Sequence, residues 1–283
     1  MEIKTVMVVG AGQMGSGIAQ VCALAGYNVF LNDLSESLVE KGHGGIAKNL
    51  NRQVEKGRMT ELEKENVLGN LRLSINLNDA QNVDIIIEAA TENMDVKKKI
   101  FARLDEIVPQ YAILASNTSS LPITEIAAAT ARPEQVIGMH FMNPVPVMKL
   151  VEIIRGLATA DKVYETVESM AKTLGKIPVE VNDFPGFVSN RILMPMINEA
   201  IYTLYEGVAT KEAIDEVMKL GMNHPMGPLT LADFIGLDTC LYIMETLHEG
   251  FGDDKYRPCP LLRKYVKAGW LGKKTGRGFY EYG

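Results

Sequence analysis

Two ionisable side chains in the middle of the sequence have the chemistry needed to move a proton. His140 directly follows the apolar run 136–139, and Glu152 lies within a second apolar run, 150–154. A histidine titrates near neutral pH, and a carboxylate in a buried strand requires a cation or a histidine beside it. The two residues are therefore candidates to lie side by side at a functional site. The pattern alone leaves a second interpretation open, in which Glu152 lies in water on an edge strand and His140 is an ordinary loop residue.

A glycine-rich segment near the N-terminus has the spacing of a dinucleotide-binding turn. It reads G-x-G-x-x-G between the apolar run 6–9 and a helical pattern over 13–25. The first glycine permits a tight turn, the second lets the backbone approach a pyrophosphate, and the third lets the helix pack closely on the sheet. The helix N-terminus favours the negative charge of that group. The residues expected to hold the cofactor here are Gly10, Gly12, Gln13, Met14 and Gly15.

An acidic residue at the expected distance supports this interpretation. Asp33 lies 18 residues after Gly15, at the end of the second strand-like run. A carboxylate there can bind the hydroxyls of the adenosine ribose, and it repels a 2′-phosphate. Leu34 follows, so the sequence places no arginine beside Asp33 to hold such a phosphate. We therefore expect NAD rather than NADP. The alternative is a chance glycine turn with Asp33 as a helix cap.

The elements that must position these residues alternate between strand and helix over the first two thirds of the chain. Continuous apolar strands between helices are typical of a parallel sheet that is covered on both faces. The sequence therefore predicts a doubly wound, mostly parallel α/β sheet. The expected strands are 6–9, 29–31, 85–87, 112–115, 136–139 and 150–154, and the expected helices are 13–25, 35–57 and 96–107.

The pattern changes at a cluster of turn residues, 182–186. The segments beyond it have helical spacing and no clear strand, and they cover 188–206, 211–220, 229–234 and 237–248. We therefore expect a dinucleotide-binding domain over 1–182 and an all-helical domain over 183–283. The glycine-containing turn between them could serve as a hinge.

Composition excludes several classes of protein. The chain has 283 residues, of which 47% are hydrophobic and 23% charged, as in ordinary globular proteins. No apolar run reaches the roughly 20 residues of a membrane span, and no cleavable leader is expected. A net charge of −6 disfavours nucleic acid as a partner. Three widely spaced cysteines indicate neither a disulfide framework nor a metal site, so we expect a cytoplasmic protein.

Several motifs, in order along almost the whole chain, resemble the L-3-hydroxyacyl-CoA dehydrogenase family, and within it the short-chain bacterial 3-hydroxybutyryl-CoA dehydrogenases. Several motifs in register are more specific than any one of them. Met142 stands where members often have phenylalanine, an apolar exchange of similar volume. The motifs are the glycine segment, EAATEN at 88–93, SNTSSL at 116–121, HFMNPVP at 140–146, PGFVSNR at 185–191 and GKKTGRGFY at 272–280.

The resemblance implies hydride transfer between NAD and C3 of an acyl-CoA, with 3-hydroxybutyryl-CoA and acetoacetyl-CoA as the expected pair. It makes His140 the base for the 3-hydroxyl proton, and Glu152 the carboxylate that orients the imidazole. Ser119 and Asn190 match polar residues that hydrogen-bond the substrate. Alone, they would equally fit a turn cap and a polar helix face. Four further residues match positions on the nicotinamide side: Glu92, Lys97, Asn117 and Asn143.

A CoA substrate carries phosphates, so this acidic protein needs a local basic site to bind it. Lys48, Arg52 and Lys56 are spaced i, i+4, i+8 on one face of the helix expected over 35–57. With the resemblance, we expect them to contact CoA, best at Lys56. The alternative is a solvated helix face, to which Glu55 would also belong.

The resemblance further implies a homodimer formed through the helical domain. Two alternative functions stay open. One is a related 3-hydroxyacid dehydrogenase, which would use a lysine on its central helix; the helix that begins near Gly186 carries Asn190 but no lysine. The other is a non-catalytic nucleotide-binding or structural member of the same fold.

Overall fold

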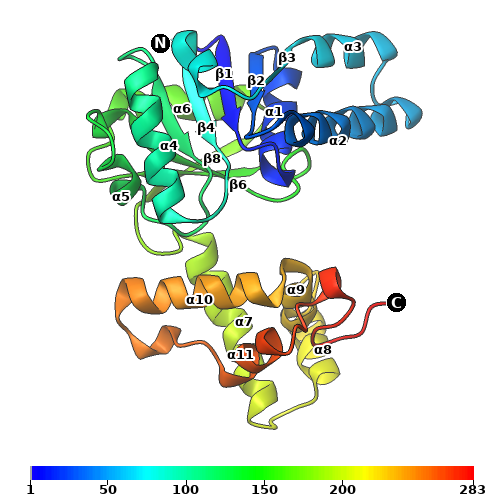
Figure 1. Ribbon diagram of the computed structural model, residues 1–283. Helices are drawn as coiled ribbons and strands as arrows, with labels where there is room; N and C mark the ends of the chain where they lie inside the picture. Colours follow the sequence, from blue (N-terminus) through cyan, green and yellow to red (C-terminus); the bar gives the residue numbers. More distant parts are fainter. Residues whose placement is uncertain (1) are drawn as a thin grey trace. The chain divides into compact units, whose positions relative to one another are not determined.

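The computed structural model describes residues 2–283, and the chain forms two compact units (Figure 1). The first unit ends at Asp183, and the second covers Phe184–Gly283. The division lies one residue from the boundary expected from the sequence.

The first unit is built on one eight-stranded sheet with the order β3-β2-β1-β4-β5-β6-β7-β8. Neighbouring strands are parallel except for β6 and β7, which are antiparallel. The doubly wound, mostly parallel sheet expected from the sequence is thereby confirmed. The strands are β1 (Thr5–Val9), β2 (Asn28–Asn32), β3 (Leu71–Ser74), β4 (Ile85–Glu88), β5 (Ile113–Ser116), β6 (Val136–Phe141), β7 (Leu150–Arg155) and β8 (Ile177–Asn182).

Helices cover both faces of this sheet (Figure 1). Alternate strand residues such as Val8 and Ile137 join one core with α1, α2, α3 and α6. The opposite face carries Gly138, and a Cβ atom built there would lie 3.0 Å from the side chain of Ile123 in α5. The helices are α1 (Gln13–Leu24), α2 (Glu36–Glu55), α3 (Glu61–Gly69), α4 (Met94–Ile107), α5 (Ile123–Ala127) and α6 (Asp161–Thr173).

Two strands that the sequence pattern did not predict, β3 and β8, lie at the two edges of the sheet. Most of their residues are partly or fully exposed, so neither strand shows the continuous apolar run of a central strand. Pro178 within β8 is compatible with an edge position. Helix α3 was also missed, although Thr60 and Glu63 form a capping box at its start.

The second unit is all helical, as expected, and it contains one further helix, α11. Its core joins apolar residues of α7, α9, α10 and α11 with Phe279 near the C-terminus. Within residues 2–283, no helix is long and apolar enough to cross a membrane. The helices are α7 (Ser189–Tyr205), α8 (Lys211–Gly221), α9 (Pro228–Ile235), α10 (Leu237–Phe251) and α11 (Pro260–Lys267).

Candidate active site

His140 and Glu152 lie directly opposite each other on the antiparallel strands β6 and β7. His140 Nδ1 is 2.8 Å from Glu152 Oε2, and the two residues are 6% and 2% exposed. Strand β6 extends through Phe141, so His140 lies within the strand rather than after it. Because β6 and β7 are both interior strands, the interpretation with Glu152 in water on an edge strand is wrong.

The hydrogen bond between the two side chains also orients the imidazole. An ionised carboxylate can only accept, so the nitrogen that faces Glu152 is the one that carries hydrogen. The ring nitrogen that can take up a proton is then Nε2. A second proton on the ring would make an imidazolium, which the adjacent carboxylate stabilises. This arrangement can remove a proton from a substrate and return it.

The glycine segment between β1 and α1 fits the pyrophosphate of a dinucleotide. Gly10 has a positive φ of 102°, and a Cβ atom there would lie 2.6 Å from the carbonyl oxygen of Ala89. A Cβ atom on Gly12 would meet no atom within 4 Å, so backbone is open there to a ligand. Gly12 caps α1 without a side-chain hydrogen bond, which leaves the N-terminal N–H groups of α1 for an anion.

Asp33 follows β2 and lies beside this segment. Its Oδ2 accepts a hydrogen bond of 2.7 Å from the backbone N–H of Ala11, and its Oδ1 accepts one of 2.7 Å from the N–H of Leu34. These bonds fix the carboxylate at the rim of the glycine turn. Each carboxylate oxygen still has a lone pair that can accept from a ribose hydroxyl.

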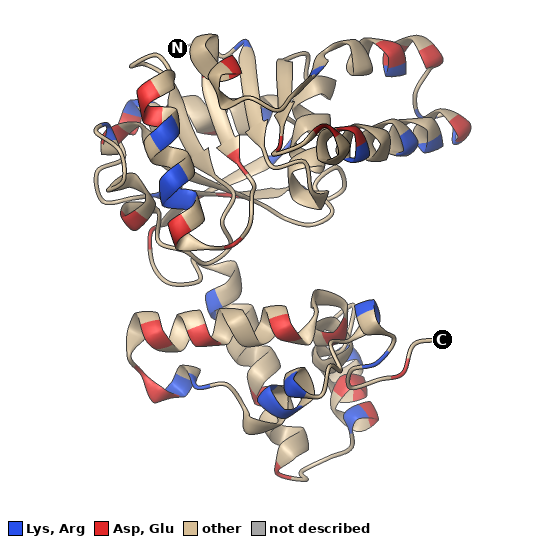
Figure 2. Cartoon of the chain, in the orientation of Figure 1, with Lys and Arg blue, Asp and Glu red and all other residues tan. Residues whose placement is uncertain are grey.

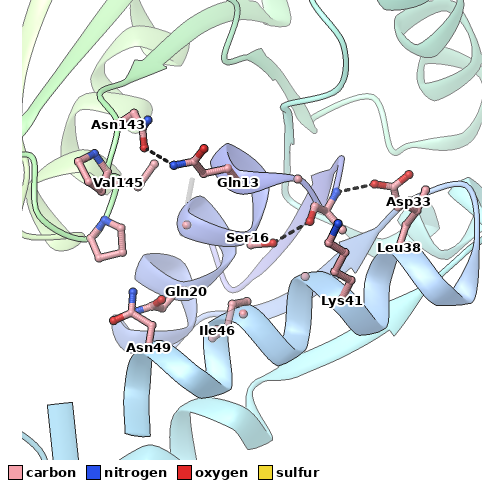
Figure 3. A pocket seen from close by; sticks show the side chains of 17 residues that line it. Gln13, Ser16, Gln20, Asp33, Leu38, Lys41, Ile46, Asn49, Asn143 and Val145 are labelled. Carbon is pink, nitrogen blue, oxygen red and sulfur yellow. Dashed lines mark hydrogen bonds between the residues drawn. The ribbon is translucent and has the colours of Figure 1, made fainter. Parts of the chain in front are cut away.

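A cavity of about 580 Å³ opens between α1, α2 and the segment that follows β6 (Figure 3). Gln13 Nε2 donates to Asn143 Oδ1 across one wall, at 3.0 Å, so two expected cofactor residues meet here. Among residues 2–283, Lys41 is the one lysine or arginine that lines the cavity. The polar residues around it are Gln13, Ser16, Gln20, Asp33, Lys41, Asn49 and Asn143.

A buried lysine holds the segment after β6 in place. Lys176 is 8% exposed, and its Nζ donates to the carbonyl oxygens of Val145 and Met148, the latter at 2.8 Å. Burial lowers the pKa of Lys176 below its ordinary value. Val145 also packs on α1, where a Cβ atom on Gly17 would lie 2.9 Å from its Cβ. The cavity wall is therefore fixed from two sides.

The four residues expected on the nicotinamide side make different contacts in the structure. Asn117 Oδ1 accepts from the N–H of Phe141 at 2.9 Å, next to His140. Glu92 accepts from the N–H of Ser119 at 2.9 Å, while Lys97 is 1% exposed and bonded to Glu88. Asn143 is exposed at the cavity. Contact of any of these side chains with nicotinamide stays a prediction.

The remaining expected residues lie in other parts of the chain. Asn190 is buried in the first turn of α7, in the second unit. Lys48 and Arg52 lie on α2, where Figure 2 shows basic positions along the helix. Helix α2 ends at Glu55, so Lys56 is its C-cap residue rather than part of the helix. All three cations are exposed, and none forms an ion pair with another residue of the described chain, 2–283.

Glu88 and Ser116 were not identified as functional residues, although both lie in motifs noted in the sequence. Glu88 ends the apolar run of β4, which is the same signal that pointed to Glu152. Ser116 donates to it at 2.7 Å. Lys41 and Asn49 were also missed; with Gly45 they form an i, i+4, i+8 row on α2 that faces the cavity.

Known proteins match both units. The family model "3-hydroxyacyl-CoA dehydrogenase, NAD binding domain" matches residues 5–184, and the model of the C-terminal domain matches residues 186–282. A probable 3-hydroxybutyryl-CoA dehydrogenase of Bacillus subtilis is 66% identical over 282 residues, with 100% of this chain and 98% of that protein covered. Human mitochondrial hydroxyacyl-coenzyme A dehydrogenase is 45% identical over 288 residues, with 99% of this chain and 91% of that protein covered. The crystal structure of (S)-3-hydroxybutyryl-CoA dehydrogenase from Ralstonia eutropha has a TM-score of 0.97 and 55% identity, with 100% of both chains covered.

Proposed function

Since the chain belongs to the 3-hydroxyacyl-CoA dehydrogenase family and is an NAD-dependent oxidoreductase, we propose that it interconverts 3-hydroxybutyryl-CoA and acetoacetyl-CoA. The observation that carries this proposal is the buried contact of 2.8 Å between His140 and Glu152. The substrate is supported by the names of full-length relatives, including those from Bacillus subtilis and Ralstonia eutropha. Reduction of acetoacetyl-CoA is the proposed direction.

In this proposal His140 is the residue that exchanges a proton with the substrate. Oxidation removes a hydride from C3 and a proton from the 3-hydroxyl group, and NAD supplies the hydride acceptor when it is bound. His140 Nε2 takes the proton, and Glu152 stabilises the imidazolium that results. In reduction the imidazolium returns the proton to the carbonyl oxygen. Ser119 and Asn190 are proposed to hydrogen-bond the substrate near that oxygen.

We propose that the first unit binds NAD through the glycine segment and Asp33. The open backbone at Gly12 and the N-terminus of α1 suit the pyrophosphate. The fixed carboxylate of Asp33 suits the ribose hydroxyls. The nicotinamide end is assigned to Glu92, Lys97, Asn117 and Asn143, following the family resemblance.

The phosphates of CoA are assigned to Lys48, Arg52 and Lys56. Two observations support this assignment: the three side chains are exposed, and none has an ion-pair partner within residues 2–283. Their positive charge is therefore available to an anionic ligand. The row that contains Lys41 and Asn49 continues along α2 toward them. The alternative is that these residues form a solvated helix face without a ligand. Substitution of Lys56 distinguishes the two possibilities.

A homodimer formed through the second unit is also part of the proposal. Several large apolar side chains of this unit are exposed, among them Val217, Leu220 and Met222 on and just after α8, and Ile192 on α7. Val217 and Leu220 are three residues apart on one helix and so share a face, and an exposed apolar face is a candidate surface for another chain to cover. The molar mass in solution, measured by light scattering, tests the dimer.

We also propose a cytoplasmic location, which is supported by three free, buried cysteines.

The deciding experiment is the oxidation of NADH by the purified protein with acetoacetyl-CoA. The proposal expects turnover that depends on acetoacetyl-CoA and falls steeply in a His140→Gln variant. A non-catalytic member would bind NADH and show no turnover, which would refute the proposal. A 3-hydroxyacid dehydrogenase with a lysine base is disfavoured, because α7 contains no lysine.

A further inference from the structure

We propose that Glu88, which has no part in the scheme above, is a positioning residue for the loop that carries Ser119. The inference rests on the proposed function, because it assigns Ser119 to the substrate. Its basis is a network of three charges, Glu88, Lys97 and Glu92, in the first unit. Glu88 is 0% exposed and lies at the carboxyl end of β4, the edge where open α/β sheets bind their ligands.

The carboxylate of Glu88 is fully engaged inside the protein. Lys97 Nζ donates to both of its oxygens, at 2.8 and 2.9 Å. Ser116 Oγ donates to Oε2 at 2.7 Å, and the N–H of Ala90 donates to Oε1 at 2.7 Å. Removing two charges from water is expensive, and an apolar pair of similar volume is often as stable. A gain in stability therefore does not explain why Glu88 and Lys97 form a buried ion pair, and their position requires another explanation.

Lys97 connects this pair to the Ser119 loop through Glu92. The ammonium lies 3.5 Å from Glu92 Oε2. Glu92 Oε1 in turn accepts from Thr118 Oγ1 at 2.6 Å, from the N–H of Ser119 at 2.9 Å, and from both the N–H and Oγ of Ser120 at 3.2 Å. The position of the Glu92 carboxylate therefore sets the positions of Thr118, Ser119 and Ser120, which all donate to it. Glu88 fixes Lys97, and Lys97 attracts Glu92.

The register of the sheet places this network on the same face as the proposed acid–base pair. Glu88 pairs with Ser116 of β5, and Ser116 pairs with Gly138 of β6. His140 is two residues beyond Gly138, and side chains two residues apart in a strand share a face. The network therefore lies on the same face of the sheet as His140, and Glu92 bonds it to the loop that follows β5. It holds Ser119 at a set distance from the base.

A substitution that keeps the shape of Glu88 and removes its charge tests this inference. Glu88→Gln leaves the buried ammonium of Lys97 with Glu92 as its remaining carboxylate. Lys97 then competes with the loop for that carboxylate, and Ser119 shifts. A displacement of about 1 Å can reduce turnover by about 10²-fold. We expect kcat with acetoacetyl-CoA to fall by at least about tenfold, with a smaller change in the KM for NADH.

The double variant Glu88→Gln/Lys97→Met separates positioning from stability. It removes the unpaired buried charge, so its Tm should recover relative to Glu88→Gln. Its kcat should stay low, because Lys97→Met removes the ammonium that attracts Glu92 in the wild type. Asp105→Asn is the matched control. It removes the charge of another ion pair of the first unit, in which Nε of the buried Arg132 lies 2.5 Å from Oδ1 of the half-buried Asp105, so it should lower the Tm and leave kcat near wild type.

Amide hydrogen exchange of the peptide around Ser119 and Ser120 gives a readout that does not depend on activity. Faster exchange in Glu88→Gln, together with unchanged exchange in Asp105→Asn, is the expected result. Unchanged exchange in Glu88→Gln would overturn the inference, as would a kcat that recovers with the Tm in the double variant. Wild-type protein without turnover would instead refute the proposed function, and the exchange measurement would still decide the role of Glu88.

Discussion

Replacing Glu152 with glutamine removes the charge that faces His140 and keeps the shape of the side chain. In the protein the two side chains are bonded at 2.8 Å, and both residues are buried. The charge matters when the imidazole carries a second proton, so the effect should appear in turnover rather than in binding of NADH. His140→Gln and the double variant complete the set, because they show whether the two residues act together.

The size of the effect follows from the geometry. A hydrogen bond to a charged group exceeds a neutral one by about 1 kcal/mol, which sets the lower limit. Two unit charges about 4 Å apart interact by about 4 kcal/mol at an effective dielectric constant of about 20, which sets the upper limit. Glu152→Gln should therefore lower kcat by about 5-fold to about 10³-fold. His140→Gln should lower it by about 10²-fold to 10⁴-fold, the usual contribution of a positioned acid or base.

The assay is steady-state oxidation of NADH at saturating acetoacetyl-CoA, with NADH affinity measured separately. The double variant should lose about as much as His140→Gln alone, because both substitutions disable one unit. Glu180→Gln is the control: Glu180 is an exposed carboxylate on the neighbouring strand β8, paired with Arg155 at 3.2 Å. It should keep wild-type turnover. Near-wild-type activity of Glu152→Gln, or a double variant whose loss is the product of the single losses, would refute the proposed pair.

Three further predictions concern the cofactor, the substrate and pH. Wild-type protein should have a higher kcat/KM with NADH than with NADPH, and Asp33→Ala should narrow the difference because the repulsion of a 2′-phosphate is lost; an equal or higher value with NADPH in the wild type would contradict this. Lys56→Ala should raise the KM for acetoacetyl-CoA more than it lowers kcat, and leave a truncated thioester without the nucleotide unaffected; an unchanged KM at low salt would make the assignment wrong. The pKa of Lys176 is lowered by burial, so the unfolded state binds more protons between that pKa and 10.5. In chemical denaturation, the stability of wild type relative to Lys176→Met should therefore rise with pH through that window, and a flat or falling difference would contradict it.

Local patterns in the sequence were sufficient for the central strands and for the cofactor turn. Central strands of a parallel sheet are buried on both faces, so they appear as apolar runs in any context. The glycine positions are equally local, because a positive φ at Gly10 and a close approach at Gly15 are needed wherever such a turn forms. The residue types of His140 and Glu152 also indicated proton transfer before the structure showed that the two side chains are in contact.

Edge strands and long-range pairs depended on the tertiary structure. Strands β3 and β8 form because neighbouring strands offer backbone hydrogen bonds, and their own residues carry little apolar signal. The pairing of His140 with Glu152 requires the chain to reverse direction between β6 and β7, which no local pattern specifies. The contact of Glu88 with Lys97 joins a strand end to a helix face. The sequence by itself therefore determined which residues can do chemistry, and the folded sheet decided which of them meet, because side-chain contacts depend on strand order and register.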